Sequence, residues 1–215
     1  MIKPFPYVLL FVILVIFTGV KGTSKKDLMD KELVGYIKTF EKDYENLSEY
    51  QRSNLMLIAE KTYQFGLSHT AAAVAWQESN FGKWPIDIAG MSCGLFHKVI
   101  PNYMKDKNME VNNFKVNVAC SDFINDNDLA IIVFLDDILY WKNSLTKRGY
   151  KGAQLLDMMY RSYNAGYRID NKDSITYSKK VQARVSVLKK KLDLDKKYAH
   201  IKVRSYQKGM TLAMN

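Results

Sequence analysis

Apolar residues recur along much of the chain at the spacing of one face of a helix. Two such stripes lie between residues 31 and 64, formed by Leu33, Tyr36, Ile37 and Phe40, and then by Leu55, Ile58, Ala59 and Tyr63. The intervals i, i+3, i+4 and i+7 are those of an amphipathic helix. Gly66 follows the second stripe, and glycine commonly ends a helix because it adopts left-handed backbone angles without strain. We therefore expect residues 31–64 to be helical.

The next two predicted helices contain the most buried positions. Ser68 is placed to cap a helix over residues 69–80, which ends at Gly82. Residues 129–141 form the most apolar stretch after the N-terminal segment and contain no Gly or Pro. Periodicity alone does not separate helix from strand here, but the length favours a nearly buried helix at the centre of the core.

The last two helices follow in the C-terminal third. One covers about residues 153–164 and stops at Gly166, and the other covers residues 177–192, with Val181, Val185, Leu188 and Leu192 on one face and lysines on the other. Residues 83–127 contain Pro, Gly, Asn and Asp at short intervals, which predicts loops with short helical turns. No alternation typical of a hairpin occurs. The predicted fold class is all-α.

The N-terminus has the order of a secretory signal. Lys3 precedes an apolar run over residues 7–17, and small residues follow it. We expect residues 1–22 to be a cleaved signal, or else an uncleaved anchor that associates with the inner membrane through residues 7–20. A chain of 215 residues then holds one ordinary domain with appendages. Its predicted parts are a linker and helical extension over 23–60, the main domain over 61–192 and a basic tail over 193–215.

The net charge points to an acidic partner. The chain has 32 basic and 22 acidic residues, a balance of +10. Nucleic acid, an anionic membrane surface and the carboxylate-bearing bacterial wall all attract such a protein. Either interpretation of the N-terminus sends the chain out of the cytoplasm, to the periplasm or the medium. We therefore expect no nucleic-acid partner, and we expect a monomer.

Glu78 is the strongest candidate for chemistry. Ala71, Val74 and Ala75 precede it by seven, four and three positions, so all four side chains share one helix face. Burial on that face raises the pKa of a carboxyl, and the negative end of the helix dipole raises it further. A proton held near neutrality is what a general acid needs. The structural alternative is a carboxylate that is solvated at a helix end.

The residues around Glu78 carry a family resemblance. Five segments are Trp-Gln-Glu-Ser-Asn-Phe-Gly at 76–82, Ser-Cys-Gly-Leu-Phe-His at 92–97, Asp-Asn-Asp-Leu-Ala-Ile at 126–131, Ser-Tyr-Asn-Ala-Gly at 162–166 and Thr-Tyr-Ser-Lys-Lys-Val at 176–181. In this order they resemble the Glu-Ser segment, the Gly-Leu-Met-Gln loop, the core helix, the Ala-Tyr-Asn-Ala-Gly motif and the closing Tyr-Val-x-x-Val segment of the soluble lytic transglycosylases. That lysozyme-like family degrades peptidoglycan.

The resemblance implies a lysozyme-like α fold with a groove for peptidoglycan glycan strands. Glu78 would protonate the glycosidic oxygen after N-acetylmuramic acid. The same carboxyl would then remove the proton from that sugar's own 6-hydroxyl as it closes onto C1, which leaves a 1,6-anhydro end without water. Ordinary glycosidases need a second carboxylate. The substrate's hydroxyl removes that need.

Three residues receive roles from the resemblance. Ser79 would hydrogen-bond near Glu78 or the sugar, Tyr163 would position the Glu78 carboxyl, and Asn164 would bind the N-acetyl sugar. Each has a structural alternative in the sequence itself. Ser79 could simply end its helix, Tyr163 could be a core residue, and Asn164 could terminate its helix before Gly166.

The remaining expected contacts lie on the loop and the closing segment. The backbone of Gly94, Leu95 and Phe96 would border the groove, with the glycine allowing close approach of a sugar ring. His97 stands where the family usually has Gln, and its imidazole still donates a hydrogen bond but can become charged in mild acid. Tyr177, in the closing segment, is a further expected substrate contact.

The chain has two cysteines. An even number in an oxidising compartment permits a disulfide, and two buried thiols are the alternative. Cys93 directly precedes the loop that should border the groove, in a region that buries little apolar surface. We predict a Cys93–Cys120 disulfide that holds this loop.

Other functions stay open at this level. Asp87 could orient a water molecule and make the chain a muramidase, as in goose-type lysozymes, or it could only shape the turn after Pro85. A wall-binding module without turnover is a third possibility. The histidines at 69, 97 and 200 are scattered and the cysteines complete no ligand set, so we expect neither a metal site nor a cofactor.

Overall fold

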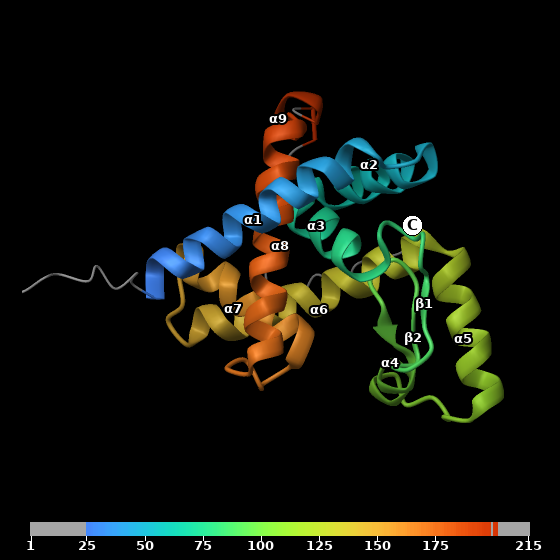
Figure 1. Ribbon diagram of the computed structural model, residues 1–215. Helices are drawn as coiled ribbons and strands as arrows, with labels where there is room; N and C mark the ends of the chain where they lie inside the picture. The colour runs from blue at the N-terminus through green and yellow to red at the C-terminus, as the bar shows by residue number, and fades with distance from the viewer. Residues whose placement is uncertain (1–24, 199, 202–215) are drawn as a thin grey trace, which may run out of the picture.

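The computed structural model describes residues 25–198, 200 and 201 (Figure 1). The predicted signal or anchor over 1–22, its possible membrane contact over 7–20, and the tail beyond residue 201 lie outside the described residues. Among the helices that the structure does describe, none has the length and apolar character needed to cross a membrane.

Helices dominate the described part of the chain, as expected. They are α1 (Lys25–Glu45), α2 (Glu49–Tyr63), α3 (Ser68–Ser79), α4 (Ile100–Asp106), α5 (Asn113–Asn125), α6 (Asn127–Lys147), α7 (Gly152–Ala165), α8 (Lys172–Lys191) and α9 (Leu194–Lys197). Three two-residue strands, β1 (Ile86–Asp87), β2 (Ser92–Cys93) and β3 (Lys98–Val99), pair antiparallel in the order β1-β2-β3. The register pairs Ile86 with Cys93 and Cys93 with Lys98.

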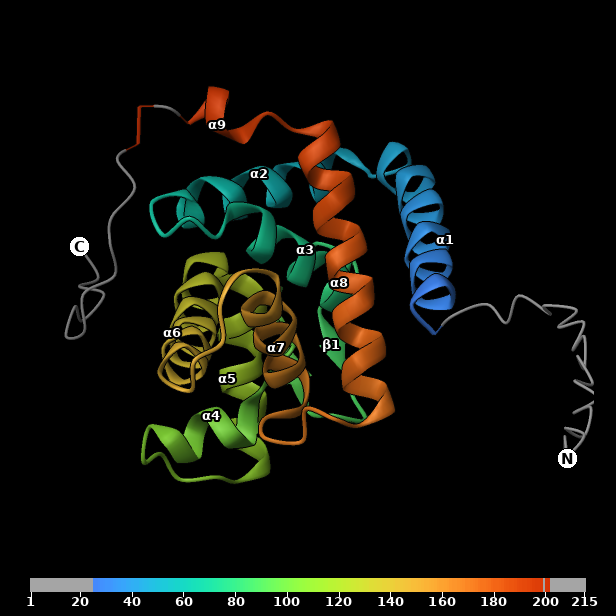
Figure 2. The same cartoon turned by 90° about the vertical axis from the view of Figure 1, so that its left-hand side faces the viewer.

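Two helices, α8 and α3, make the central packing contacts of the fold. α8 packs along α1, α3 and α7, and Figure 2 shows it standing between α1 on one side and α6 and α7 on the other. α3 occupies the centre, and the run from Ala71 to Ala75 is completely buried. The predicted central helix, α6, forms as expected but keeps an exposed face that includes Tyr140. The most buried place belongs to α3 because its small side chains let neighbouring helices approach closely.

Several helix boundaries differ from the prediction. The expected helix over 31–64 is two helices, because Ser48 starts α2 with a capping box in which its side chain and that of Gln51 satisfy each other's backbone N–H groups. Ser68 does not cap α3; it is the first helical residue, and its Oγ donates to the carbonyl of Ala59 at 2.8 Å. α8 begins at Lys172, earlier than predicted, because Asn171 caps it.

The region expected to be loops has more regular structure than predicted. It contains the small sheet, α4 and the 13-residue α5. Asn112 starts α5 by accepting a hydrogen bond from the backbone of Lys115 at 2.9 Å. Strands of two residues are too short to show an alternating pattern in sequence. The predicted end of α7 at Gly166 is confirmed, with a positive φ of 62° at the glycine.

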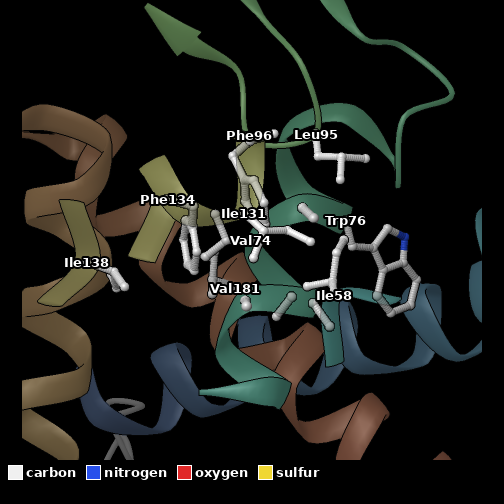
Figure 3. Close-up of a cluster of buried hydrophobic side chains, with 14 of the residues drawn as sticks. Ile58, Val74, Trp76, Leu95, Phe96, Ile131, Phe134, Ile138 and Val181 are labelled. Carbon is white, nitrogen blue, oxygen red and sulfur yellow. The ribbon is translucent and has the colours of Figure 1, made fainter. Parts of the chain in front are cut away.

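The hydrophobic core is continuous from α1 to α8. Phe96 stacks on Phe134 with ring centroids 4.2 Å apart, and both side chains belong to the buried cluster drawn in Figure 3. On the other side of α3, Phe40 and Tyr44 from α1 pack against Trp76 at 5.8 and 6.2 Å. The helical extension therefore shares one core with the main domain that was predicted to begin at residue 61.

The start of the predicted tail is also packed. α9 follows Asp193, which caps it through a hydrogen bond to the backbone of Lys196. Leu194 and Tyr198 are buried and cover Ala59 on α2. Apolar contact of this kind fixes residues 194–198 against the body of the protein.

The small sheet is tied to α5 by a disulfide. Cys93 on β2 and Cys120 on α5 are bonded, with their Cα atoms 5.4 Å apart. The bridge closes a loop with a sequence separation of 27 residues. It joins the segment directly before Gly94 to the helix that packs behind it.

We expect the double substitution Cys93→Ser with Cys120→Ser to lower the free energy of unfolding by about 3–4 kcal/mol, because an open chain of this loop length gains entropy when it unfolds. Urea unfolding of the oxidised wild type and the variant measures the difference. A loss below about 1 kcal/mol would show that the bridge does not constrain the unfolded chain as the loop-entropy argument requires.

Candidate functional site

Glu78 lies at the point where the buried helix α3 reaches the surface of the core. α3 ends at Ser79, and Asn80 takes left-handed backbone angles with φ 52°. The carboxyl therefore follows about three turns of mostly buried helix, yet its side chain keeps 18% of its surface exposed. Glu78 is enclosed enough to be desolvated and open enough to meet a ligand.

Two side chains face the two oxygens of the Glu78 carboxyl. The hydroxyl of Tyr177, on α8, donates to Oε1 at 2.5 Å. The Nδ1 atom of His97 lies 3.7 Å from Oε2. Because Nε2 of His97 is 2.7 Å from the carbonyl oxygen of Trp84, which only accepts hydrogen bonds, Nε2 carries a hydrogen. The imidazole is thereby held with Nδ1 toward the carboxyl.

The environment of Glu78 favours its protonated form. Burial raises the pKa of Glu78 from 4.5 to about 7. The hydrogen bond from Tyr177 and the positive charge of Arg184 act in the opposite direction, and the charge of Asp87 adds to the rise. Burial holds the pKa of Tyr177 well above its usual value of 10, so this phenol keeps its proton and stays a donor. The predicted desolvated carboxyl is what the structure contains.

Two cavities meet at Glu78. The larger, which we call the α7-side cavity, has a volume of about 590 Å³ and includes Asp87, Phe96, His97, Trp141, Tyr163, Asn164 and Arg168 in its lining. The smaller, the α1-side cavity, has a volume of about 370 Å³ and includes Asp43, Asn46, Gln77, Lys83, Trp84 and Arg184. Glu78 lines both. A long ligand that occupied the two cavities would pass over this carboxyl.

Tyr163 and Asn164 lie where a ligand in the α7-side cavity would touch them. Asn164 is exposed at the end of α7. Tyr163 donates from its hydroxyl to the carbonyl of Phe96 at 3.0 Å and thereby fixes the loop that carries His97. The expected role of Tyr163, positioning the Glu78 carboxyl, falls instead to Tyr177, because that hydroxyl is the one bonded to Oε1.

Ser79 is not placed to contact a ligand. It has no exposed surface. Its Oγ donates to the carbonyl of Leu95 at 2.7 Å and accepts from the backbone N–H of Gly82 at 2.8 Å. The expectation of a contact with sugar is therefore corrected: Ser79 joins the end of α3 to the loop that precedes His97.

The loop glycine serves packing within the protein. Gly94 has φ 82°, and a Cβ at this position would lie 2.6 Å from the carbonyl oxygen of Phe123. The close approach is thus to α5, and the expected approach of a sugar ring at Gly94 is corrected. Leu95 is a core residue with 2% of its surface exposed and is not in the lining of either cavity. Phe96 lines the α7-side cavity but is mostly covered by its stack on Phe134.

Sequence reasoning missed the residues that surround Glu78 from other elements. Arg184 follows Tyr177 by seven positions on α8 and so shares its helix face, a signal that the lysine-rich pattern of this helix obscured. Asp137 pairs with Lys98 at 2.7 Å in the wall of the α7-side cavity. Trp84 and Trp141 add aromatic surface to the α1-side and α7-side cavities respectively.

The described residues include no group of three or more His, Cys, Asp or Glu side chains that could hold a metal ion. Comparison of the chain with models of protein families, with curated protein sequences and with solved structures gave no match.

We expect Glu78→Gln to change how stability depends on pH. The folded carboxyl binds its proton more tightly than the unfolded one, so the wild type loses stability as pH rises from 4.5 through about 7. The loss reaches about 3 kcal/mol above that range, at roughly 1.36 kcal/mol per pKa unit. Glutamine does not ionise. The free energy of unfolding of the variant, relative to that of the wild type, should therefore increase by about this amount between pH 4 and pH 8.

Urea unfolding at several pH values measures this difference. Glu60→Gln, at an exposed position on α2, is the control and should follow the wild type. Parallel stability curves for Glu78→Gln and the wild type would contradict a desolvated carboxyl at this position.

Proposed function

We propose that this protein is a peptidoglycan lytic transglycosylase of lysozyme-like fold, with Glu78 as its general acid and then its base. The observation that carries the proposal is the buried carboxyl of Glu78, with a pKa of about 7, where two cavities meet. A general acid works best when its pKa lies near the working pH. The order of the five resembling segments and the net charge of +10 support a wall substrate.

The residues suggest how the reaction runs. The protonated Glu78 gives its proton to the oxygen that joins C1 of N-acetylmuramic acid to the next sugar, and the C1–O bond breaks. The next sugar leaves with a 4-hydroxyl. The carboxylate then takes the proton of the muramic 6-hydroxyl as O6 bonds to C1. Glu78 ends protonated, no water is consumed, and a 1,6-anhydro ring is formed.

Tyr177 suits this cycle because it serves both states of Glu78. A neutral phenol donates to Oε1 whether or not the carboxyl is ionised, so the group keeps one orientation through both proton transfers. The proton to be transferred then belongs to Oε2, the oxygen that faces His97. In the α7-side cavity, Asn164 offers its side-chain amide to the sugar, while His97 offers only an acceptor, Nδ1, because its Nε2–H donates to Trp84.

A hydrolytic muramidase is the second candidate, and Asp87 favours it. Its side chain lines the α7-side cavity together with Glu78, and its charge raises the pKa of Glu78. A carboxylate there could direct a water molecule to C1 in place of the 6-hydroxyl. The two reactions differ in the product end, which is anhydro in one case and reducing in the other.

We expect Glu78→Gln to remove glycan cleavage, with a loss of at least about 10²–10⁴-fold, because one group supplies both proton transfers. Glutamine is nearly isosteric, so packing of α3 should persist. Digestion of purified sacculi, followed by mass spectrometry of the soluble fragments, measures the rate and the product end together.

Asp87→Asn separates the two candidates. Under the proposal it still releases anhydro fragments, since no water needs to be directed. If the wild type releases fragments with reducing ends and Asp87→Asn does not, the muramidase hypothesis is supported and the transglycosylase hypothesis is wrong. Cleavage by Glu78→Gln at the wild-type rate would remove both.

We expect Tyr177→Phe to lower kcat by about tenfold through lost orientation of the carboxyl. Its hydrogen bond lowers the pKa of Glu78, so losing it raises that pKa. Activity needs the protonated acid, and the alkaline limb of the kcat/KM profile should therefore move to higher pH. Tyr163→Phe, which loses only a bond to a backbone carbonyl, should leave that limb in place. An unmoved limb in Tyr177→Phe would contradict the positioning role.

A further inference from the structure

Arg184 is a largely buried cation in the wall of the α1-side cavity. Its guanidinium lies 3.7 Å from the ring centre of Phe40 and 5.4 Å from that of Trp76. Nη1 donates to Oε1 of Gln77 at 2.7 Å. These contacts hold the planar group in one orientation beside the cavity.

Among the residues that the structure describes, no anion pairs with this guanidinium at close range. The ion pairs formed by the described residues do not include Arg184. Its Nε atom is buried and has no hydrogen-bond partner in the described part of the chain. Burial lowers the pKa of Arg184 to about 10, while the charges of Asp43 and Glu78 favour its charged form. An unpaired buried cation costs stability, so its presence beside an open cavity calls for a ligand.

Glu78 does not fill this need at neutral pH. Its carboxyl forms no ion pair with Arg184, and with a pKa of about 7 it is only partly ionised near neutral pH. Asp43 lines the same cavity but lies outside ion-pair distance of Arg184. Lys83 adds a second, exposed positive charge at the cavity.

We propose that the α1-side cavity is a carboxylate-binding subsite in which Arg184 receives an acidic group carried by the substrate. This proposal rests on the proposed function, and it names which part of the wall the cavity recognises: the carboxyl-bearing peptide substituent of the muramic sugar. A guanidinium binds a carboxylate through two parallel N–H···O bonds, a geometry that its fixed plane favours. Neutral glycans such as chitin fragments lack this group.

The helical extension builds the cavity. Asp43 belongs to α1, and Asn46 and Leu47 follow it directly, so one wall comes from residues before the predicted main domain. The stack of Arg184 on Phe40 also depends on α1. Ion pairs across the exposed edge join α1 to α8: Glu32–Lys179, Glu41–Lys190 and Glu45–Lys191.

Binding without turnover tests the proposal. In the Glu78→Gln background, calorimetry measures the affinity for a soluble disaccharide-peptide fragment of peptidoglycan, and for the same fragment with its carboxyls converted to methyl esters. We expect the acid form to bind at least about tenfold more tightly than the ester, as a charge-assisted bidentate pair implies. Adding Arg184→Gln should bring the two affinities within about twofold of each other.

Lys189→Gln is the matched control. It removes one positive charge from an exposed position of the same helix, so it should keep the preference for the acid form. If Arg184→Gln fails to fold, the nitrogen-15 NMR signal of the Arg184 Nε–H group in the Glu78→Gln protein replaces it. That signal should shift with the acid fragment and not with the ester.

Equal affinity for acid and ester in the Glu78→Gln protein would overturn the subsite. The proposal would also be wrong if Arg184→Gln kept the preference for the acid form, or if the Nε–H signal did not shift when the acid fragment was added. These results are distinct from failure of the proposed function, which would show as absence of glycan cleavage by the wild type. If the wild type bound the acid fragment through Arg184 but did not cleave glycan, the subsite proposal would stand and the proposed enzymatic function would be wrong.

Discussion

The packing of α3 against α8 is the contact on which the site depends. Five successive residues from Ala71 to Ala75 have no exposed surface, four of them alanines, and this lets α8 lie close along the helix. The close approach brings the Tyr177 hydroxyl onto the carboxyl of Glu78. Bulkier side chains on α3 would separate the two helices. The carboxyl would then lose its donor and gain water, and both changes would alter its proton affinity.

Three contacts from different parts of the structure hold the loop before His97, and none of them fills the cavity. Ser79 binds the carbonyl of Leu95, Tyr163 binds that of Phe96, and the disulfide anchors the strand just before Gly94. Ser79 and Tyr163, to which the family resemblance assigned contacts with Glu78 or the sugar, thus support the loop that carries His97. In the proposed mechanism the geometry of the site has to hold through two proton transfers, and such supports serve this because loops are otherwise mobile.

The charges around Glu78 divide between its two cavities. Asp87 lies on the α7 side and favours the protonated carboxyl, whereas Arg184 lies on the α1 side and favours the ionised one. Burial is the largest effect; it exceeds the lowering by the Tyr177 hydrogen bond and Arg184, and the pKa is about 7. The proposed subsite and the proposed acid therefore share one electrostatic environment, in which a cation and a carboxylate of the protein flank the reacting group.

The sequence by itself determined the helices with strong periodicity, the stop at Gly166 and the desolvation of Glu78, because these follow from neighbours within one helix turn or two. The tertiary structure decided everything that depends on distant segments. It exchanged the roles of Tyr163 and Tyr177, buried Ser79, set Gly94 against α5, and made α1 a wall of the second cavity. Local patterns report which face of a helix is apolar, but they do not report which side chain of another helix meets it. That choice is made by packing of the whole core.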